Sequence, residues 1–310
     1  MRLERHPHNP IFPNVPGTWR DSQTANPDLL QIGDVYHMYF RGQEGGHDRI
    51  GLATIPVDQF DGVTWEILEE PVIDVGEAGT PDETHVLDPA SVLVDGRVFL
   101  YYSAVSPTCS RSICLATSSD GIHFSKHEQN PIVIGGGPEI VHHEGCFYLY
   151  YWGNRPGGGF DLHLSTSEDG TTFTAHPTGP VLPVGGAGAW DSHTVETPRI
   201  FEEDGLFYML FCGSDRHNDY PQSAGLATSR DLIHWEKYDG NPIFERGAGG
   251  QWDEGAIWFT TVEKIGGRYW LWYEGYGGGT ARTVPYGDYL TKGRSQIGLA
   301  TLDAEFFFVR

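Results

Sequence analysis

The sequence predicts an all-β fold, a five-bladed β-propeller closed by the pairing of its N- and C-terminal segments. A phrase of four parts recurs five times along the 310 residues, and 41 glycines and 20 prolines supply turns between strands rich in aromatic and aliphatic residues. A four-stranded blade cannot bury both of its faces alone, so repeats of this size stack against their neighbours. The competing interpretation is a β-sandwich whose strands are alike by coincidence.

The first part of the phrase is an aromatic strand that follows a short turn. Its alternation of large apolar residues is typical of β-strands, and every copy ends on a small residue. The five copies are VYHMYFRG (35–42), RVFLYYSA (97–104), CFYLYYWG (146–153), LFYMLFCG (206–213) and RYWLWYEG (268–275).

The other parts are a Leu-Ala-Thr or Leu-Ser-Thr strand, a turn that ends on an aromatic residue, and an X-Pro step. The strand recurs at 51–54, 114–117, 163–166, 225–228 and 298–301. The proline step is missing after the last copy and stands instead at the N-terminus, as Asn9-Pro10. We therefore expect residues 3 to 6 to pair with the last blade, beside the segment from Ile297 to Phe308, which would remove an exposed sheet edge.

Composition fits a single propeller catalytic domain over residues 1–310. The 39% hydrophobic content can fill the cores between blades. The 20 basic and 42 acidic residues give a net charge of −22, which argues against nucleic acid or an anionic membrane as a partner. With no apolar N-terminal segment, we expect a cytoplasmic protein. The four cysteines show no metal-ligand spacing and are expected to be reduced.

Candidate functional residues lie just before or within the first strand of each blade. In a propeller this strand lines the central channel, so side chains from five blades converge on one volume. A carboxylate buried there is costly unless it is paired, solvated or working, and several together indicate a site. The acids are Asp28, Asp88, Glu139, Glu196 and Glu254, and His85, His193 and Arg199 lie beside them.

Each candidate also has a structural interpretation. An acid follows a tryptophan in three blades, which predicts that Asp21, Asp191 and Asp253 join blades by hydrogen bonds. Glu254 and Trp258 are expected to shape a pocket wall rather than to react. Tryptophans near the channel could stack on a sugar or fill the core between blades; they are Trp19, Trp190, Trp252 and Trp258.

With these residues the chain resembles the five-bladed propeller glycoside hydrolases. The Asn-Pro-Ile step at 130–132, the Ile-Gly-Leu-Ala-Thr strand at 50–54 and the Asp-Gly-Ile-His-Phe turn at 120–124 look most like families 43 and 130, with features of family 32. The resemblance covers essentially the whole chain. It implies a channel site with one acid from each first strand and no required cofactor.

Family 43 implies a base aspartate on the first blade, an orienting aspartate on a middle blade and an acid glutamate at a Glu-Gly-Pro step. Asp88-Pro89 matches the middle motif, and Glu196-Thr197-Pro198 is similar to the glutamate step. The first blade departs from the pattern with Asn26-Pro27-Asp28. Either Asp28 or Asp21 takes the base role, or the chain does not use this mechanism.

Family 130 implies a Glu-Asp-Pro-Arg motif with a catalytic aspartate. Residues 87–90 (Leu-Asp-Pro-Ala) match the aspartate of this motif, and residues 196–199 (Glu-Thr-Pro-Arg) match its first and last residues. Phosphorylases of that family also need a cluster of basic residues for phosphate. The obvious candidates are few, Arg199, Arg216 and His217, so the sequence favours hydrolysis over phosphorolysis.

The predicted function is therefore a glycoside hydrolase. Cleavage needs a proton donor and a second carboxylate. Crowded acids can hold a proton near neutral pH. We expect Glu196 to be the general acid, Asp28 the general base and Asp88 the orienting residue. An inverting enzyme would place acid and base about 6.5 to 9.5 Å apart, and a retaining one about 5 to 5.5 Å. The expected substrate-binding residues are Glu139, Glu254, His85, His193, Arg199, Trp190 and Trp258.

Two other functions stay open, a phosphorylase of the mannoside-phosphorylase type and a sugar-binding propeller without catalysis. The acids differ from blade to blade, which suits one asymmetric site and favours an enzyme. The inserts at 215–223 and 277–292, with Tyr220, Tyr286 and Tyr289, are expected to close one end of the funnel and make the enzyme exo-acting. A Ca²⁺ ion in the channel is an alternative suggested by His85, His142, His143 and His193.

Overall fold

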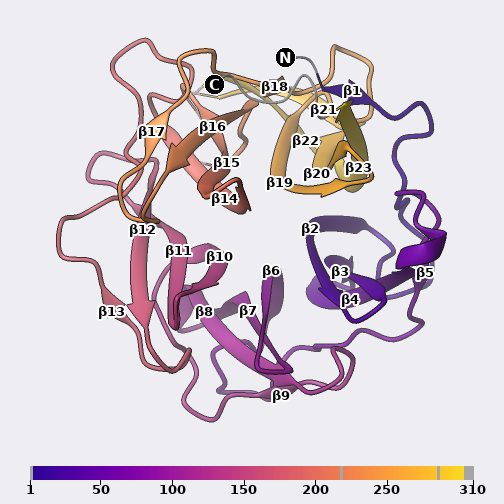
Figure 1. The fold of residues 1–310 in the computed structure, drawn as a ribbon. Helices are drawn as coiled ribbons and strands as arrows, with labels where there is room; N and C mark the ends of the chain where they lie inside the picture. The colour runs from indigo at the N-terminus through magenta and orange to yellow at the C-terminus, as the bar shows by residue number, and fades with distance from the viewer. Residues whose placement is uncertain (1–2, 217–218, 285–286, 304–310) are drawn as a thin grey trace. The chain divides into compact units, whose positions relative to one another are not determined.

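Five antiparallel sheets form the blades of the computed structural model, which describes residues 3–216, 219–284 and 287–303 (Figure 1). The chain is an all-β, five-bladed β-propeller, as predicted. Within the described ranges the one helix is a 3-10 turn, η1 (Val57–Gln59). No helix there is long and apolar enough to cross a membrane.

Blades one to three each contain four strands in chain order. They consist of β2 (Gln23–Ile32), β3 (Val35–Glu44), β4 (His47–Pro56) and β5 (Glu66–Ile67); β6 (His85–Val94), β7 (Arg97–Ser106), β8 (Cys109–Ser118) and β9 (Ser125–Lys126); and β10 (Gly136–His143), β11 (Cys146–Asn154), β12 (Phe160–Ser167) and β13 (Thr174–Ala175).

Blade four adds a short fifth strand to the same order, and blade five borrows its outer strand from the N-terminus. They consist of β14 (Thr194–Glu203), β15 (Leu206–Ser214), β16 (Ser223–Ser229), β17 (Glu236–Lys237) and β18 (Phe244–Glu245); and β19 (Ala256–Ile265), β20 (Arg268–Gly277), β23 (Arg294–Asp303) and β1 (Glu4–Arg5). The insert between β20 and β23 forms a separate hairpin, β21 (Thr280–Val284) with β22 (Gly287–Thr291).

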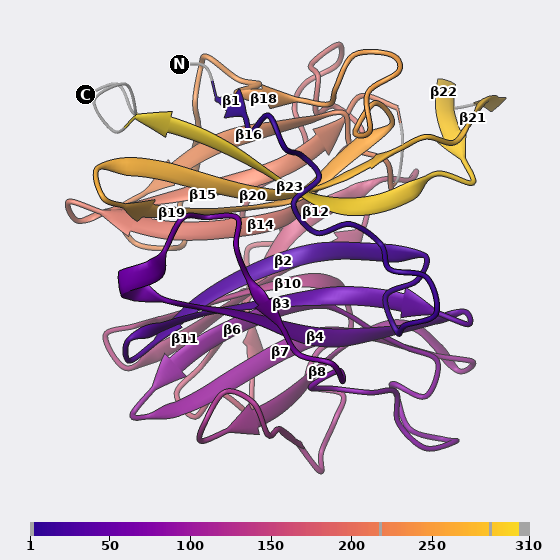
Figure 2. The same ribbon diagram turned by 90° about the vertical axis from the view of Figure 1, so that its right-hand side faces the viewer.

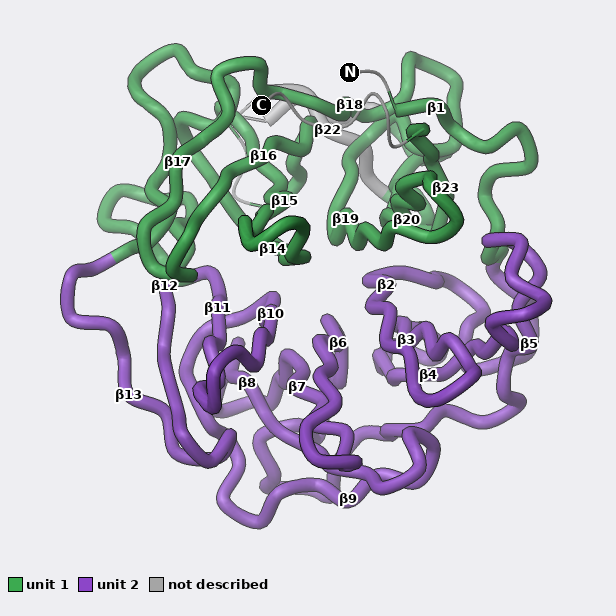
Figure 3. Tube along the Cα trace, in the orientation of Figure 1, with its two compact units in different colours: residues 1–13, 153–162, 180–310 green, residues 14–152, 163–179 purple. Residues whose placement is uncertain are grey.

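The chain forms two compact units (Figure 3). One unit comprises Asn14–Trp152 and His163–Gly179, and the other comprises Met1–Pro13, Gly153–Leu162 and Pro180–Arg310. In the first unit, blades one and two pack through residues such as Tyr39 and Leu100. In the second unit, blades four and five pack through residues such as Leu210 and Ile257. The alternating apolar residues of the repeat fill these cores.

The predicted pairing of the N-terminus with the last blade is confirmed over the described residues. Glu4 pairs with Thr301 and Arg5 with Ala300, so that β1 lies beside β23 (Figure 2). The side chain of Asn9 clamps the backbone of Leu299: its Oδ1 accepts from the Leu299 N–H at 2.8 Å and its Nδ2 donates to the Leu299 carbonyl at 2.9 Å. The expected partner segment ran to Phe308, which lies outside the described residues.

This asparagine clamp identifies the N-terminal proline step as the missing fifth copy of the repeat. In blade two the Asn130 side chain makes the same pair of bonds to Leu115, at 2.8 and 3.0 Å. In blade four Asn241 makes them to Leu226, both at 2.8 Å. The prolines that follow mark the step in the sequence, and the asparagines make its contacts.

The same three blades share an ion pair between the loop before the first strand and the outer strand. A cation lies beside a buried aspartate in each: Lys126 Nζ 2.5 Å from Asp82, Lys237 Nζ 2.5 Å from Asp191, and Arg5 Nε 2.8 Å from Asp253. We call this pair the blade latch. Asp191 and Asp253 therefore join two parts of their own blade, where the sequence predicted that they join neighbouring blades.

Blade one has no such latch, and Asp21 differs from the expectation that it matches Asp191. The Cβ of Arg20 lies near Gly42, as the Cβ of Asp191 lies near the equivalent Gly213, so Arg20 occupies the latch position. Asp21 instead accepts a hydrogen bond from the Gly17 N–H at 2.8 Å. The tryptophan lies seven residues before the positive-φ residue in all three blades, so blade one has an arginine at the position where the other two have an aspartate, and Asp21 is one residue further along.

We predict that Arg5→Met lowers the free energy of unfolding by about 2–4 kcal/mol, because it leaves the Asp253 carboxylate buried without its cation. The Asp253 side chain is 0% exposed and that of Arg5 is 30% exposed. Chemical denaturation measures the change. The control is Arg268→Met at the exposed Arg268–Asp303 pair, where we expect a loss below about 1 kcal/mol. Equal losses in the two variants would show that the latch does not stabilise the fold.

Candidate active site

The first strand of every blade contains a β-bulge at the same place. The pairing register shifts after Ala25, Leu87, Gly136, Glu196 and Trp258. The next residue in each strand has a positive φ: Asn26 (51°), Asp88 (55°), Gly137 (57°), Thr197 (49°) and Phe259 (48°). L-residues rarely adopt this conformation, and asparagine and aspartate tolerate it best. Strained backbone held at one place in every blade is typical of functional sites.

Aligned on the bulge, the three predicted catalytic acids occupy three different positions. Asp88 is the positive-φ residue itself and matches Asn26. Asp28 lies two residues later and matches Glu139 and Arg199. Glu196 lies one residue earlier, at the position of Leu87. Each acid is buried, with exposures of 5% for Asp28, 6% for Asp88 and 2% for Glu196.

The position of Asp28 ties neighbouring first strands together. Its Oδ2 accepts a hydrogen bond of 2.5 Å from Ser91 Oγ, which links β2 to β6. In the other unit the equivalent Arg199 donates from Nε to Thr261 Oγ1 at 3.1 Å, which links β14 to β19. The Arg199 guanidinium also lies 4.8 Å from the ring centroid of Phe259. These contacts give both residues a clear structural role.

Asp88 is different because none of the described residues binds its carboxyl group. Across residues 3–216, 219–284 and 287–303 no hydrogen bond or ion pair reaches its side chain. Its strand neighbours Leu87 and Ala90 are apolar and buried. A buried carboxylate without a partner costs free energy, so a chain that keeps one at a strained position gains nothing in stability from it.

Glu196 lies in a second buried cluster, in the unit with blades four and five. It pairs across the sheet with Cys212 on β15. Burial raises the pKa of the Cys212 thiol to about 12, and the negative charges of Glu196 and Glu274 add to this effect. Glu274 lies on β20, where its Oε1 accepts a hydrogen bond of 2.5 Å from Ser295 Oγ. The charges of two buried carboxylates thus both raise the pKa of one thiol.

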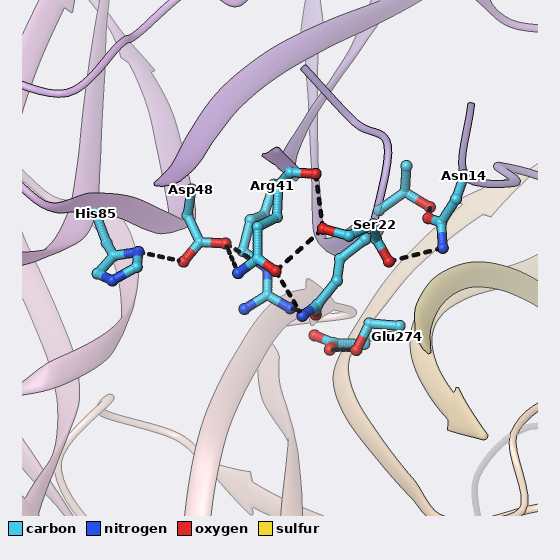
Figure 4. Close-up of polar contacts among 10 residues, drawn as sticks. Asn14, Ser22, Arg41, Asp48, His85 and Glu274 are labelled. Carbon is cyan, nitrogen blue, oxygen red and sulfur yellow. Dashed lines mark hydrogen bonds and ion pairs between the residues drawn. The ribbon is translucent and has the colours of Figure 1, made fainter. Parts of the chain in front are cut away.

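A polar network joins blades one and two at the start of their first strands (Figure 4). Its centre is Asp48 on β4, which is 4% exposed. One carboxylate oxygen lies 2.8 Å from His85 Nδ1, and the other accepts from Gln43 Nε2 at 2.9 Å. Arg41 Nε lies 3.8 Å from Asp48. Burial alone would raise the pKa of Asp48, but Arg41 and His85 reverse this and hold it below its usual value.

The other predicted binding residues have varied surroundings. Glu254 Oε2 accepts the Gly250 N–H at 2.6 Å within its own loop. Trp190 lies over Gly213 and Gly225, where a Cβ would fall 2.8 and 2.6 Å from its ring. Trp258 packs in a buried cluster with Tyr276. His193, which precedes β14, forms a backbone hydrogen bond with Ser214. Glu139 is buried on β10.

The basic candidates for phosphate binding and the inserts are only partly described. Arg216 forms two bonds to Asp215, at 2.6 and 2.8 Å. His217 and Tyr286 lie outside the described residues, and so does the side chain of Tyr289. The ring centroids of Tyr220 and Trp258 lie 5.6 Å apart. In the described part of the chain no group of three or more His, Cys, Asp or Glu side chains could hold a metal ion.

Sequence reasoning missed Arg41, Asp48 and Glu274. Arg41 and Glu274 precede the final small residue of the aromatic strands, which the repeat marks as scaffold. That position does carry a signal, since it changes completely between copies: Arg41, Ser103, Trp152, Cys212 and Glu274. Each of these residues pairs with the residue just before the bulge. Variation inside a repeat therefore locates residues beside the strained strand.

We predict that Asp88→Asn keeps the free energy of unfolding within about 1 kcal/mol of the wild type or raises it, because asparagine tolerates a positive φ and the change removes a buried carboxyl group that no described residue binds. The control is Asp82→Asn, which breaks a blade latch in the same blade and is expected to cost about 2–4 kcal/mol. Chemical denaturation compares the two. A large loss in Asp88→Asn would mean that its carboxylate stabilises the fold.

Comparison with known proteins supports the resemblance seen in the sequence. Residues 140–248 match the profile of glycoside hydrolase family 130, described as beta-1,4-mannooligosaccharide phosphorylase. Two uncharacterized proteins of Mycobacterium tuberculosis are each 24% identical to this chain over 265 residues, which span 82% of this chain and 70% of theirs.

Similar solved structures include a glycosyl hydrolase from Bacteroides ovatus, with a TM-score of 0.75 and 16% identity over 98% of this chain and 94% of that one. Another is described under the GH130 family of mannoside phosphorylases, which contains glycoside hydrolases that target beta-1,2 mannosidic linkages in Candida mannan; its TM-score is 0.74 and its identity 16%, with the same coverage. A thermostable family-43 glycoside hydrolase has a TM-score of 0.67 and 17% identity over 93% and 92% of the chains. At these identities the likeness shows the fold.

Proposed function

We propose that this chain is a carbohydrate-active enzyme that hydrolyses mannosides, with Asp88 as the proton donor. The observation that carries the proposal is the state of Asp88, which is buried, strained and without a partner among the residues that the structure describes. Such a group is available to protonate the leaving oxygen of a glycosidic bond. The mannoside class is supported by the match to the mannooligosaccharide phosphorylase profile and by the likeness to the family-130 structure.

This assignment changes two of the roles expected from the sequence. Asp28, the expected base, accepts a 2.5 Å bond from Ser91, and its counterpart Arg199 makes a similar tie. These contacts support a structural role for Asp28. Asp88, the expected orienting residue, becomes the acid. Glu196 keeps a proposed catalytic role as a carboxylate, and exo action stays part of the proposal on account of the inserts.

Hydrolysis is preferred to phosphorolysis because the described basic candidates are already engaged. Arg199 bonds to Thr261 and to the carbonyl of Pro198, and Arg216 pairs with Asp215. The family profile favours phosphorolysis as the second candidate. In that reaction inorganic phosphate would take the place of water, and the role of Asp88 would be the same.

We predict that Asp88→Asn lowers kcat/KM on mannobiose by about 100- to 10,000-fold, the range for loss of a general acid or base. The loss should be far smaller on a 2,4-dinitrophenyl mannoside, whose leaving group departs without a proton. The control is Asp95→Asn, a positive-φ aspartate at a turn of the same blade, which should be silent. Equal losses on both substrates would contradict the proton-donor role.

The substrate class is tested with nitrophenyl mannosides, arabinofuranosides, xylosides, galactosides and fructosides, assayed with the wild type and Glu196→Gln. We expect turnover of a mannoside by the wild type and a loss of at least about 100-fold in Glu196→Gln. The reaction should release mannose at a rate independent of inorganic phosphate. Formation of mannose 1-phosphate would show that the chain is a phosphorylase instead. If the wild type turned over no glycoside and the variant bound sugar as well as the wild type, the proposal that the chain is an enzyme would be wrong.

A further inference from the structure

We infer that His85 accepts a hydrogen bond from a hydroxyl group of the bound sugar through Nε2, and that Asp48 is the positioning residue that makes this acceptor. The inference rests on the proposed function, since the sugar is the glycoside that Asp88 is proposed to protonate. The sequence suggested that His85 binds substrate but gave no partner for it. The structure assigns that partner and with it the ring nitrogen that faces the carboxylate.

His85 lies on the strand that carries Asp88, and one of its ring nitrogens is open to a ligand. His85 is the first residue of β6, and Asp88 lies three residues later on the same strand. The His85 side chain is 26% exposed, whereas the Asp48 side chain is 6% exposed. The second ring nitrogen of His85 is turned away from Asp48 (Figure 4). Over the described ranges, no hydrogen bond or ion pair reaches this nitrogen, so a ligand can bind it.

The chemistry of the pair fixes which nitrogen carries the proton. The lowered pKa of Asp48 keeps its carboxylate ionised, and an ionised carboxylate only accepts hydrogen bonds. An N–H at Nδ1 of His85, 2.8 Å away, is therefore what this carboxylate favours. In the neutral ring this leaves the lone pair on Nε2, which accepts from an O–H group. Carboxylates orient histidines in the same way in metal sites.

Asp48 is itself held by a chain of side-chain contacts. Gln43 donates to Asp48, and the Gln43 Oε1 accepts from Ser22 Oγ at 3.1 Å and from Gln23 Nε2 at 3.0 Å. Arg41 donates to Gln23 Oε1 at 2.7 Å and adds its charge beside Asp48. A group supported in this way keeps its geometry before the ligand arrives.

Two other Asp–His pairs show what a merely structural pair looks like here. His123 Nδ1 lies 2.8 Å from Asp120, and His234 Nδ1 lies 2.7 Å from Asp231. Both imidazoles are more than 80% exposed, and both aspartates use their other oxygen to accept two backbone N–H groups of a tight turn. Asp48 forms no such turn, and it reaches His85 from another blade.

The first test reads the imidazole directly and needs no activity. Long-range ¹H–¹⁵N spectra of histidine-labelled full-length protein report the tautomer, and His85→Gln identifies the His85 signal. We expect the Nδ1-protonated tautomer in the wild type and its loss in Asp48→Asn. Addition of methyl β-mannoside should shift the Nε2 signal of His85 and leave that of His123 unchanged. An Nε2-protonated ring in the wild type, or no shift with the mannoside, would overturn the inference.

The second test pairs protein variants with monodeoxy mannosides. His85→Phe should raise KM about 10-fold with little change in kcat, the size of one lost hydrogen bond. For one of the monodeoxy mannosides, KM should be the same in His85→Phe as in the wild type, because the hydroxyl group that this substrate lacks is the partner of Nε2. His123→Phe is the control and should be silent. A fall in melting temperature without a change in KM would make His85 a structural tie, whereas an inactive wild type would refute the proposed function and not the tautomer.

Discussion

A one-residue bulge in the first strand of each blade is the constraint on which the rest of the site depends. Before the bulge the strand pairs in one register, and beyond it the faces on which side chains lie are exchanged. The bulge therefore separates a residue that faces its own blade's second strand, such as Glu196, from one that reaches the neighbouring first strand, such as Asp28. Asp88 lies at the bulge itself, where no described side chain or backbone group bonds to its carboxyl group.

The scaffold around these bulges is maintained by contacts that are not uniform. Blades two, four and five have both an asparagine clamp and a blade latch, and the N-terminal Asn9 and Arg5 provide them for blade five. In blade one, Ile67 occupies the position that holds the cation of the latch in blades two, four and five. Among the described residues blade three lacks both contacts as well, and blade one contributes instead the polar network centred on Asp48.

The fold could be predicted from the sequence because each blade is specified locally, by an aromatic strand, a Leu-Ala-Thr strand and a turn. The closure followed from the displaced Asn9-Pro10 step. The site could be predicted only in part. The sequence showed that blade one has Asn26 where the Asp-Pro step of blade two has Asp88, but a one-residue register shift leaves no mark on the repeat, so the different surroundings of Asp28 and Asp88 could not be read from it. Grouping Asp21 with Asp191 and Asp253 also overlooked that Arg20, not Asp21, directly follows the tryptophan of blade one. The pairing of Asp48 with His85 joins different blades and has no local signature.

The central claim is that Asp88, presented by a strained bulge, donates the proton in glycoside cleavage. A crystal structure with a sulfur-linked mannobiose, which the enzyme cannot cleave, tests it most directly. The account predicts that the interglycosidic sulfur lies within hydrogen-bond reach of an Asp88 carboxyl oxygen. A bound disaccharide whose sulfur lies beside another carboxylate, with Asp88 out of reach, would contradict it.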